Sequence, residues 1–188
     1  MLGTKSFYLI FLSLFFILPA FFMLNPLLMT LGLERGLTKE MALFGVMLVG
    51  IFSALGRLSI AWISDKIGRL GSIVLILAMT AVGVIAMIFA EGVLFLVSLS
   101  MIAMAFGGAA GVYPTLTADH FGTKNLGVNY GLVTLSLGAS SLIFTMVNNA
   151  LSGNGDYTLS FIIAAATCAI SFVLILLLRR EKPVTQTV

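Results

Sequence analysis

Arg57 lies inside a stretch of apolar residues, Met41–Ile63, that is long enough to cross a membrane as a helix. A charged turn with Asp65 follows eight residues after Arg57. At about 1.5 Å per residue, Arg57 would lie roughly 12 Å from this turn, near the middle of a hydrocarbon core about 30 Å thick. A guanidinium does not lose its charge, and placing it in lipid costs at least about 2.5 kcal/mol. Such a residue usually faces a cavity, so the sequence predicts that Arg57 meets an anion within a membrane protein.

The composition extends this prediction to the whole chain. Of its 188 residues, 60% are hydrophobic and only 9% are charged, against about 25% charged in ordinary soluble domains. Six apolar segments are each long enough to span a bilayer, and their unbroken runs are typical of helices rather than barrel strands. We therefore expect an all-α membrane protein, a single domain of six transmembrane helices with a cytoplasmic tail at 179–188. The predicted spans cover residues 6–30, 41–63, 70–90, 92–118, 126–150 and 158–178.

The basic residues of the loops predict how these spans are oriented. Seven of them fall on one side of the membrane, whereas Arg35 and Lys39 on the other side are offset by Glu34 and Glu40. The positive-inside rule then places both termini in the cytoplasm, in a cell membrane such as a bacterial inner membrane. The first segment could also be a signal peptide, but it is long and lacks a clear cleavage site, so we interpret it as a span. The seven residues are Lys5, Lys66, Arg69, Lys124, Arg179, Arg180 and Lys182.

Other classes of function are not expected. The basic residues form no patch or run, so no nucleic-acid partner is predicted. The sequence holds no cluster of metal ligands, phosphate-binding loop or nucleophile–base pair, so neither a metal, a cofactor nor an enzyme is predicted. Cys168 is the only cysteine, and in its apolar segment it is expected to pack. His120 beside Asp119 could suggest a proton relay, but the pair falls at a helix end, where a solvated cap is the preferred interpretation.

The turn after the second span carries a short charged motif. Asp65 would lie at a helix end where it can pair with a basic residue, and Gly68 would allow a tight turn. Lys66 and Arg69 would hold the cytoplasmic side. The motif resembles the loop that the major facilitator superfamily carries once in each six-helix half, with Ala61 in place of the usual leading glycine. The alternative interpretation is an ordinary positively charged loop.

A second region is similar to one family within that superfamily. Gly111–Thr115, Asp119–Thr123 and Asn129–Gly131 resemble the fourth and fifth helices in the C-terminal half of the oxalate/formate antiporters. Gly56-Arg57, ahead of the charged turn, matches the same family. The resemblance covers residues 7–182. It implies the C-terminal six-helix half of a carrier for small carboxylates.

The resemblance implies a role for Arg57, which stands where the oxalate exchangers have an arginine that contacts the substrate carboxylate. Those exchangers use a lysine of the fifth helix as a second cation, and Leu137 stands at its position here. One cation in place of two favours a monoanion such as formate, lactate or pyruvate over oxalate. The alternative is that Arg57 bonds neighbouring carbonyls in a structural network.

Helical periodicity groups further candidates on the fifth span. Leu137, Ser141 and Asn148 fall within about 20° of Tyr130 around the helix. Their hydroxyl and amide groups are predicted either to line the substrate pathway or to bond adjacent helices, and the sequence does not separate the two. A neighbouring stripe of glycines is expected to allow close helix packing, and it consists of Gly127, Gly131 and Gly138.

Prolines interrupt two of the spans. Pro114 follows Gly111 in the fourth span, where its missing N–H is predicted to kink the helix, either for gating or as passive packing. Pro19 and Pro26 predict similar breaks in the first span, and Asn25 is a further candidate for the cavity.

The resemblance implies a complete carrier of two six-helix halves with the substrate between them. Six spans supply one half. The predicted partners are therefore the lipid bilayer, a small organic anion, and either an N-terminal six-helix half or a second copy of the chain. The expected function is transport of a small organic anion by alternating access. The alternative is a truncated or regulatory membrane component with no transport activity of its own.

Overall fold

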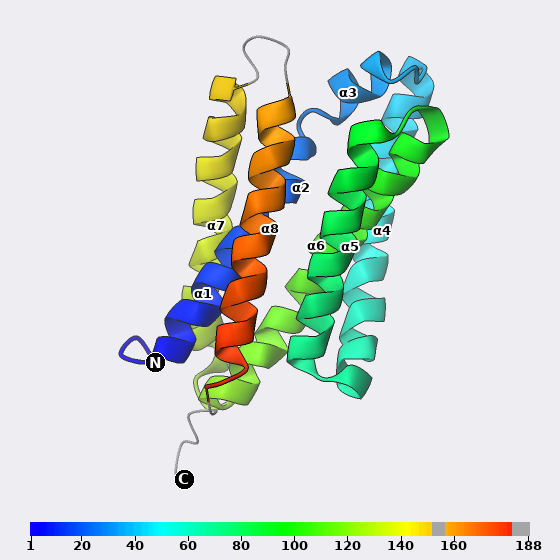
Figure 1. The fold of residues 1–188 in the computed structure, drawn as a ribbon. Coiled ribbons are helices and arrows are strands. Elements are labelled where there is room, and N and C mark those ends of the chain that lie inside the picture. Colours follow the sequence, from blue (N-terminus) through cyan, green and yellow to red (C-terminus); the bar gives the residue numbers. More distant parts are fainter. Residues whose placement is uncertain (152–156, 182–188) are drawn as a thin grey trace.

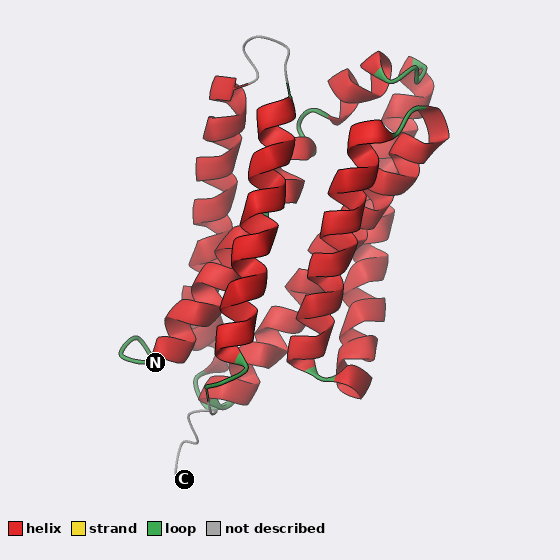
Figure 2. Cartoon of the chain, in the orientation of Figure 1, coloured by secondary structure: helices red, strands yellow, loops and turns green. Residues whose placement is uncertain are grey.

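The computed structural model describes residues 1–151 and 157–181, and it confirms the all-α class (Figures 1 and 2). No strand occurs among these described residues. The helices are α1 Lys5–Ile17, α2 Pro19–Leu24, α3 Leu28–Glu34, α4 Lys39–Ile67, α5 Arg69–Phe89, α6 Gly92–Phe121, α7 Leu126–Leu151 and α8 Thr158–Leu178.

Six spans in the described part of the chain are long and apolar enough to cross a membrane, as predicted. Five of them are the single helices α4 to α8, and the first combines α1 with α2. Among the single-helix spans, the largest difference from the predicted bounds is at the end of α4, which continues to Ile67 rather than Ile63. Of the predicted tail, residues 182–188 lie outside the described residues, as does Lys182 of the basic set.

The first span differs from the single helix expected over residues 6–30. It breaks at Leu18 because Pro19 begins a new helix and cannot continue the hydrogen-bond ladder of α1. It ends at Leu24, ahead of Asn25-Pro26, and the remaining residues form the separate short helix α3. The two prolines that cause these breaks are visible in the sequence. The first span nevertheless ends earlier than its hydropathy suggests.

The break between α1 and α2 leaves a backbone carbonyl that another helix satisfies. Pro19 has no N–H, so it cannot donate to the carbonyl of Phe15, four residues earlier. Ser140 of α7 is fully buried, and its Oγ donates to this oxygen at 2.8 Å. The Oγ of Ser171 in α8 likewise donates to the carbonyl of Ser13 at 2.9 Å. Side chains of α7 and α8 therefore stabilise the interrupted span.

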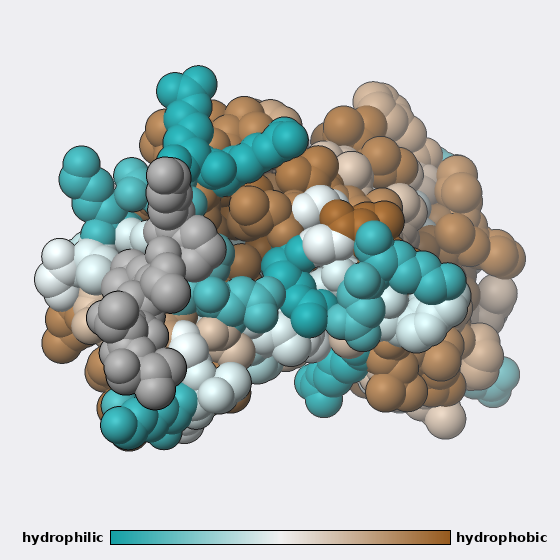
Figure 3. All heavy atoms as spheres, turned by 90° about the horizontal axis from the view of Figure 1, so that it is seen from below, coloured by the Kyte–Doolittle hydropathy of each residue, from teal (hydrophilic) through white to brown (hydrophobic). Residues whose placement is uncertain are grey.

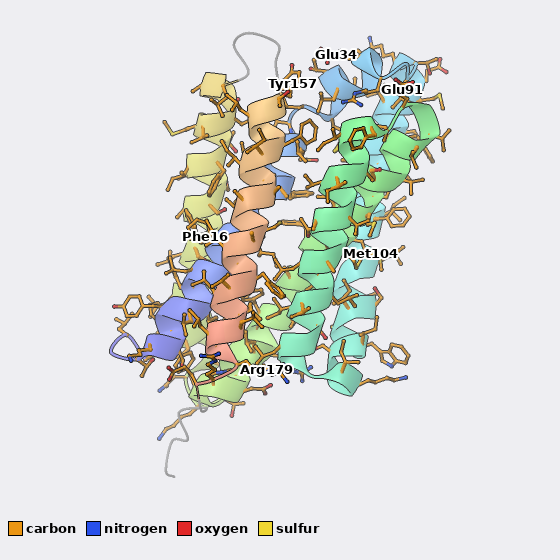
Figure 4. All side chains as sticks on the ribbon, viewed as in Figure 1. Phe16, Glu34, Glu91, Met104, Tyr157 and Arg179 are labelled. Carbon is orange, nitrogen blue, oxygen red and sulfur yellow. The ribbon has the colours of Figure 1, made fainter. Side chains whose placement is uncertain are left out.

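Charged residues gather at the two ends of the bundle. The chain starts α1 and finishes α8 at the same end as the α4–α5 and α6–α7 turns, which we call the terminal end (Figure 1). Seen from this end, hydrophilic residues lie across the bundle, with apolar residues around them (Figure 3). Glu34 and Glu91 lie at the opposite end, far from Arg179 (Figure 4). Between the ends, many large apolar side chains are exposed, as helices in contact with lipid require.

Helix α6 forms the centre of the bundle and is the most buried of the six spans. Two apolar clusters surround it. One, which includes Tyr113 and Ile175, joins α6 to α1, α5 and α8. The other, which includes Phe95 and Leu99, joins it to α2, α3 and α4. Helices α4 and α7 are the least buried spans, so each leaves a face uncovered by the rest of the chain.

Candidate functional site

Arg57 lies near the middle of α4, ten residues before its last residue, Ile67. That separation corresponds to roughly 15 Å along the helix axis. The Arg57 side chain is exposed and has no hydrogen bond or ion pair with any described residue. The described residues therefore provide no structural network of the kind considered as its alternative role. A cation in this position is available to a ligand that comes from outside the chain.

The backbone around Arg57 is fixed by contact with α6. A Cβ atom on Gly111 would lie 2.8 Å from the carbonyl oxygen of Arg57. One turn earlier on each helix, a Cβ on Gly107 would overlap the carbonyl of Ser53. A Cβ on Gly56 of α4 would likewise overlap the carbonyl of Met104 in α6. Only glycine lets the two backbones approach this closely. Of the predicted site residues, the structure thus brings together Arg57 and Gly111.

The predicted polar face of α7 turns mainly toward the rest of the bundle. Tyr130 and Leu137 pack against the cluster that contains Tyr113. Asn148 is fully buried, and its Oδ1 accepts a hydrogen bond from Ser160 of α8 at 2.8 Å. Ser141 is half-buried. This arrangement favours the second of the two interpretations, that these groups hold adjacent helices, at least for Asn148.

The glycine stripe of α7 does not pack as expected. A Cβ atom on Gly127, Gly131 or Gly138 would meet no atom within 4 Å. The prediction of close packing by these glycines is wrong within this chain, because α7 presents them to an open face. Large apolar side chains such as Leu142 and Met146 are also exposed on α7.

The remaining candidates lie at or near the proline interruptions. Asn25 ends α2 and is exposed, next to the short helix α3. Pro114 is half-buried, and α6 continues through it without a break from Gly92 to Phe121. Their parts in substrate contact and gating stay predictions.

The charged turn ties three helices together at the terminal end. Arg69, at the start of α5, places Nη1 2.6 Å from Oδ1 of Asp65 in α4 and Nε 3.3 Å from Oδ2 of Asp119 in α6. Gly68 has a φ of +83°, a value that favours glycine. The ammonium of Lys66 lies 3.7 Å from the centre of the Trp62 ring, within range of a cation–π contact. The pairing of Asp65 and the tight turn at Gly68 are both present.

Sequence reasoning missed that Asp119 belongs to this cluster. A repeat in the sequence could have indicated this contact. Asp65 lies three residues before Gly68, and Asp119 lies three residues before Gly122. Gly68 has φ +83° and ψ 160°, and Gly122 has φ +77° and ψ 168°, so the two turns share one backbone geometry. Equivalent turns at the ends of α4 and α6 bring both carboxylates to the same guanidinium.

His120 was expected to be a solvated cap, and this prediction is wrong. Its side chain is buried, and Nδ1 lies 3.1 Å from the carbonyl oxygen of Leu116. The last turn of α6 is not free in solvent because α5 and α8 flank it, and Val74 and Ile175 line the same cavity as His120.

Comparison with known proteins decides the family. The model of the Major Facilitator Superfamily matches residues 10–188, nearly the whole chain. The chain belongs to the major facilitator superfamily. This confirms the resemblance inferred from Asp65, Lys66, Gly68 and Arg69, and it makes the chain a multi-pass membrane protein of a transporter superfamily.

Two major facilitator relatives illustrate the similarity. The chain is 29% identical over 163 residues to the oxalate:formate antiporter of Oxalobacter formigenes, a match that covers 84% of the chain and 39% of that protein. It is 35% identical over 99 residues to the uncharacterized MFS-type transporter YhjX of Escherichia coli (strain K12), which covers 52% of the chain and 25% of that protein. The chain thus spans less than half the length of each of these relatives.

Proposed function

We propose that this chain forms the C-terminal half of a carrier for a small organic anion, preferably a monocarboxylate such as formate, lactate or pyruvate. The observation that carries the proposal is Arg57, an exposed cation in mid-helix without a partner among the described residues. In lipid this charge would cost at least about 2.5 kcal/mol, whereas an anion in a cavity neutralises it. The planar guanidinium also matches a carboxylate through two parallel hydrogen bonds.

The choice of a monoanion rests on the fifth span. The relative named oxalate:formate antiporter supports a small carboxylate as the class of substrate. Leu137, at the position where the resemblance implies a second cation, is apolar and packs against the core. A single arginine balances one negative charge, so we favour a monocarboxylate and consider oxalate less suited.

A second six-helix half is proposed to cover α4 and α7. These are the least buried spans, and α7 adds an open glycine stripe at which another backbone can approach closely. With a partner half in place, Arg57 would face a cavity between the halves rather than lipid. The partner would be an N-terminal half or a second copy of this chain. The exposed apolar side chains include Met47, Ile51, Leu55 and Leu58 of α4 and Leu135, Leu142 and Met146 of α7.

The terminal end is proposed to face the cytoplasm of a cell. Lys5, Lys66, Lys124, Arg179 and Arg180 lie at this end, which agrees with the positive-inside rule. Transport would begin when an anion binds Arg57 near the membrane midplane. Rocking of one half against the other would then open the site to the opposite side.

Other side chains are proposed to complete the anion site. Ser141 and Tyr130 are half-buried on α7 and would offer hydroxyl donors to the carboxylate. Asn25 would contribute from the break after α2. Asn148, which accepts a hydrogen bond from Ser160, would act by holding α7 against α8.

Uptake into liposomes tests the proposal. The chain is reconstituted alone and together with the N-terminal six-helix half of an oxalate:formate antiporter relative, and uptake of radiolabelled formate, lactate, pyruvate and oxalate is measured. We expect uptake of a monocarboxylate with both halves present, and its loss in Arg57→Ala. Ile85→Ala, which trims an exposed side chain of α5 outside the proposed interface, is the control and should retain uptake.

The competing function is a regulatory or truncated component without transport. If the folded and inserted chain supports no uptake alone, with the partner half or at high copy number per liposome, the carrier proposal is overturned. Uptake that survives in Arg57→Ala would leave a carrier but would remove Arg57 as its anion site.

A further inference from the structure

A cavity of about 480 Å³ opens at the terminal end between α5, α6 and α8. Its volume falls within the roughly 300–1,000 Å³ of typical small-molecule sites. Arg57 does not line it, so the cavity is distinct from the proposed carrier site. Its polar lining combines Arg69, Asp119, His120 and Arg179, and its apolar lining includes Ile67, Leu70, Val74, Leu116, Ile175 and Leu176.

The cavity carries more positive than negative charge. Arg69 is bonded to two carboxylates, of which Asp119 also lines the cavity. Arg179, just beyond the last turn of α8, has no hydrogen bond or ion pair from its side chain to any described residue. One guanidinium is thus engaged within the protein and the other is available to a ligand.

The start of α5 adds donors on the same wall. The cap residue of α5 is Gly68, and no side chain caps the helix. Arg69, Leu70 and Gly71, which form this first turn, line the cavity. The first N–H groups of a helix have no partner within it, and they carry the positive end of the helix dipole. An anion in the cavity would satisfy them.

His120 supplies a further polar group in the wall. Nδ1 lies 3.1 Å from the carbonyl oxygen of Leu116, which assigns the proton to this nitrogen. Nε2 has no hydrogen-bond partner among the described residues and is not closed off from solvent, so it is open to the cavity that His120 lines. A polar group of a ligand in the cavity would hydrogen-bond to this nitrogen.

The other half of the cavity is a hydrocarbon surface. Val74 and Leu176 are exposed on α5 and α8 and continue the wall from the charged rim along the helices. An inorganic anion would use the rim and leave this wall uncovered. A ligand with an anionic head and a hydrocarbon chain fits both parts.

We propose that this cavity binds an anionic phospholipid of the cytoplasmic leaflet. Its phosphate would lie between Arg179 and the first turn of α5, with a headgroup hydroxyl near His120 and an acyl chain along Val74 and Leu176. Basic pockets between transmembrane helices at this face are suited to anionic headgroups. The inference rests on the proposed orientation and does not depend on the carried substrate.

Lipid retention measured by native mass spectrometry tests this site. The whole chain is reconstituted with phosphatidylglycerol and phosphatidylcholine of identical acyl chains, then released from detergent in the spectrometer. We expect one retained phosphatidylglycerol and little phosphatidylcholine. Arg179→Ala should lower that retention about tenfold, since a hydrogen bond to a charged group is lost. Arg180→Ala removes the same charge from the next residue, which lies outside this cavity, and should change retention less than twofold.

A second variant tests the site by volume rather than charge. Gly71 lines the cavity, and a Cβ atom there would meet only ordinary contacts of 3.6–3.8 Å with Ile67. Gly71→Leu should therefore fold normally and displace the lipid. Equal loss in the two arginine variants, equal retention of both lipids, or displacement by millimolar inorganic phosphate would each overturn the proposal. These readouts require no transport, so they stand whether or not the carrier proposal fails.

Discussion

The carbonyl oxygen of Arg57 rests against Gly111, 2.8 Å from the point that a Cβ atom would occupy. The proposed anion-binding residue thus lies on the close contact between α4 and α6. Its side chain is exposed, whereas its backbone packs so closely on Gly111 that it cannot shift without moving α6. Movement of the Arg57 backbone and movement of α6 are therefore mechanically linked.

Gly56→Ala should destabilise the chain by about 1–3 kcal/mol, because the added methyl group overlaps the carbonyl of Met104 and forces α4 away from α6. Gly50→Ala, on the same helix, places its methyl group in open space and should be neutral or stabilising, since alanine favours helix. Unfolding in mixed micelles by increasing SDS gives both values. Equal effects at the two positions would show that the α4–α6 contact does not depend on glycine.

Arg57→Leu should abolish transport without lowering the stability of the chain. The variant removes a charge that has no partner among the described residues, so the free energy of unfolding in a bilayer should stay the same or rise. Anion uptake by the assembled carrier should be lost. Arg57→Lys should retain the charge but bind a carboxylate about tenfold more weakly, because it lacks the guanidinium fork. A marked loss of stability in Arg57→Leu would instead indicate a structural role.

Ser140→Ala should cost about 1–3 kcal/mol of stability, because it leaves the carbonyl of Phe15 unsatisfied in an apolar environment. Ser136→Ala is the matched control, since Ser136 is equally buried but bonds only Val133 of its own helix. In a Pro19→Ala background the backbone regains an N–H for Phe15, so the effect of Ser140→Ala should shrink. A double-mutant cycle measures this coupling. Additive effects would contradict the assigned hydrogen bond.

Gly68→Ala should destabilise the chain by about 1–3 kcal/mol although nothing lies within 4 Å of the added methyl group. The cause is the backbone, since φ +83° with ψ 160° lies in a region that is nearly exclusive to glycine. Gly71→Ala, three residues later in regular helix, should have the opposite sign. Thermal unfolding followed by circular dichroism distinguishes the two, and a stabilising Gly68→Ala would rule out strain at this turn.

The spans and the mid-helix position of Arg57 were predictable because each depends on local chemistry. Twenty apolar residues in a row have few alternatives to a spanning helix, and a charge in mid-span must avoid lipid. The charged turn was predictable for the same reason, since Asp65 and Arg69 are four residues apart and Gly68 between them allows a tight turn.

Relations between distant helices were not predictable in this way. Asp119 meets Arg69 only because the ends of α4 and α6 adopt the same turn beside α5. The rotation of α7, which buries Asn148 and exposes Gly138, depends on neighbouring helices rather than on its own periodicity. The burial of His120 likewise requires α5 and α8 to flank the end of α6.

The hydrogen bond from Ser140 to Phe15 sets a condition on the order of biosynthesis. The first span leaves the ribosome more than a hundred residues before Ser140, so it enters the bilayer with a carbonyl that neither its own backbone nor lipid can bond. Insertion of this chain is therefore complete only when α7 arrives. A nascent chain stopped before α7 would expose a defect in its first span that membrane quality control can recognise.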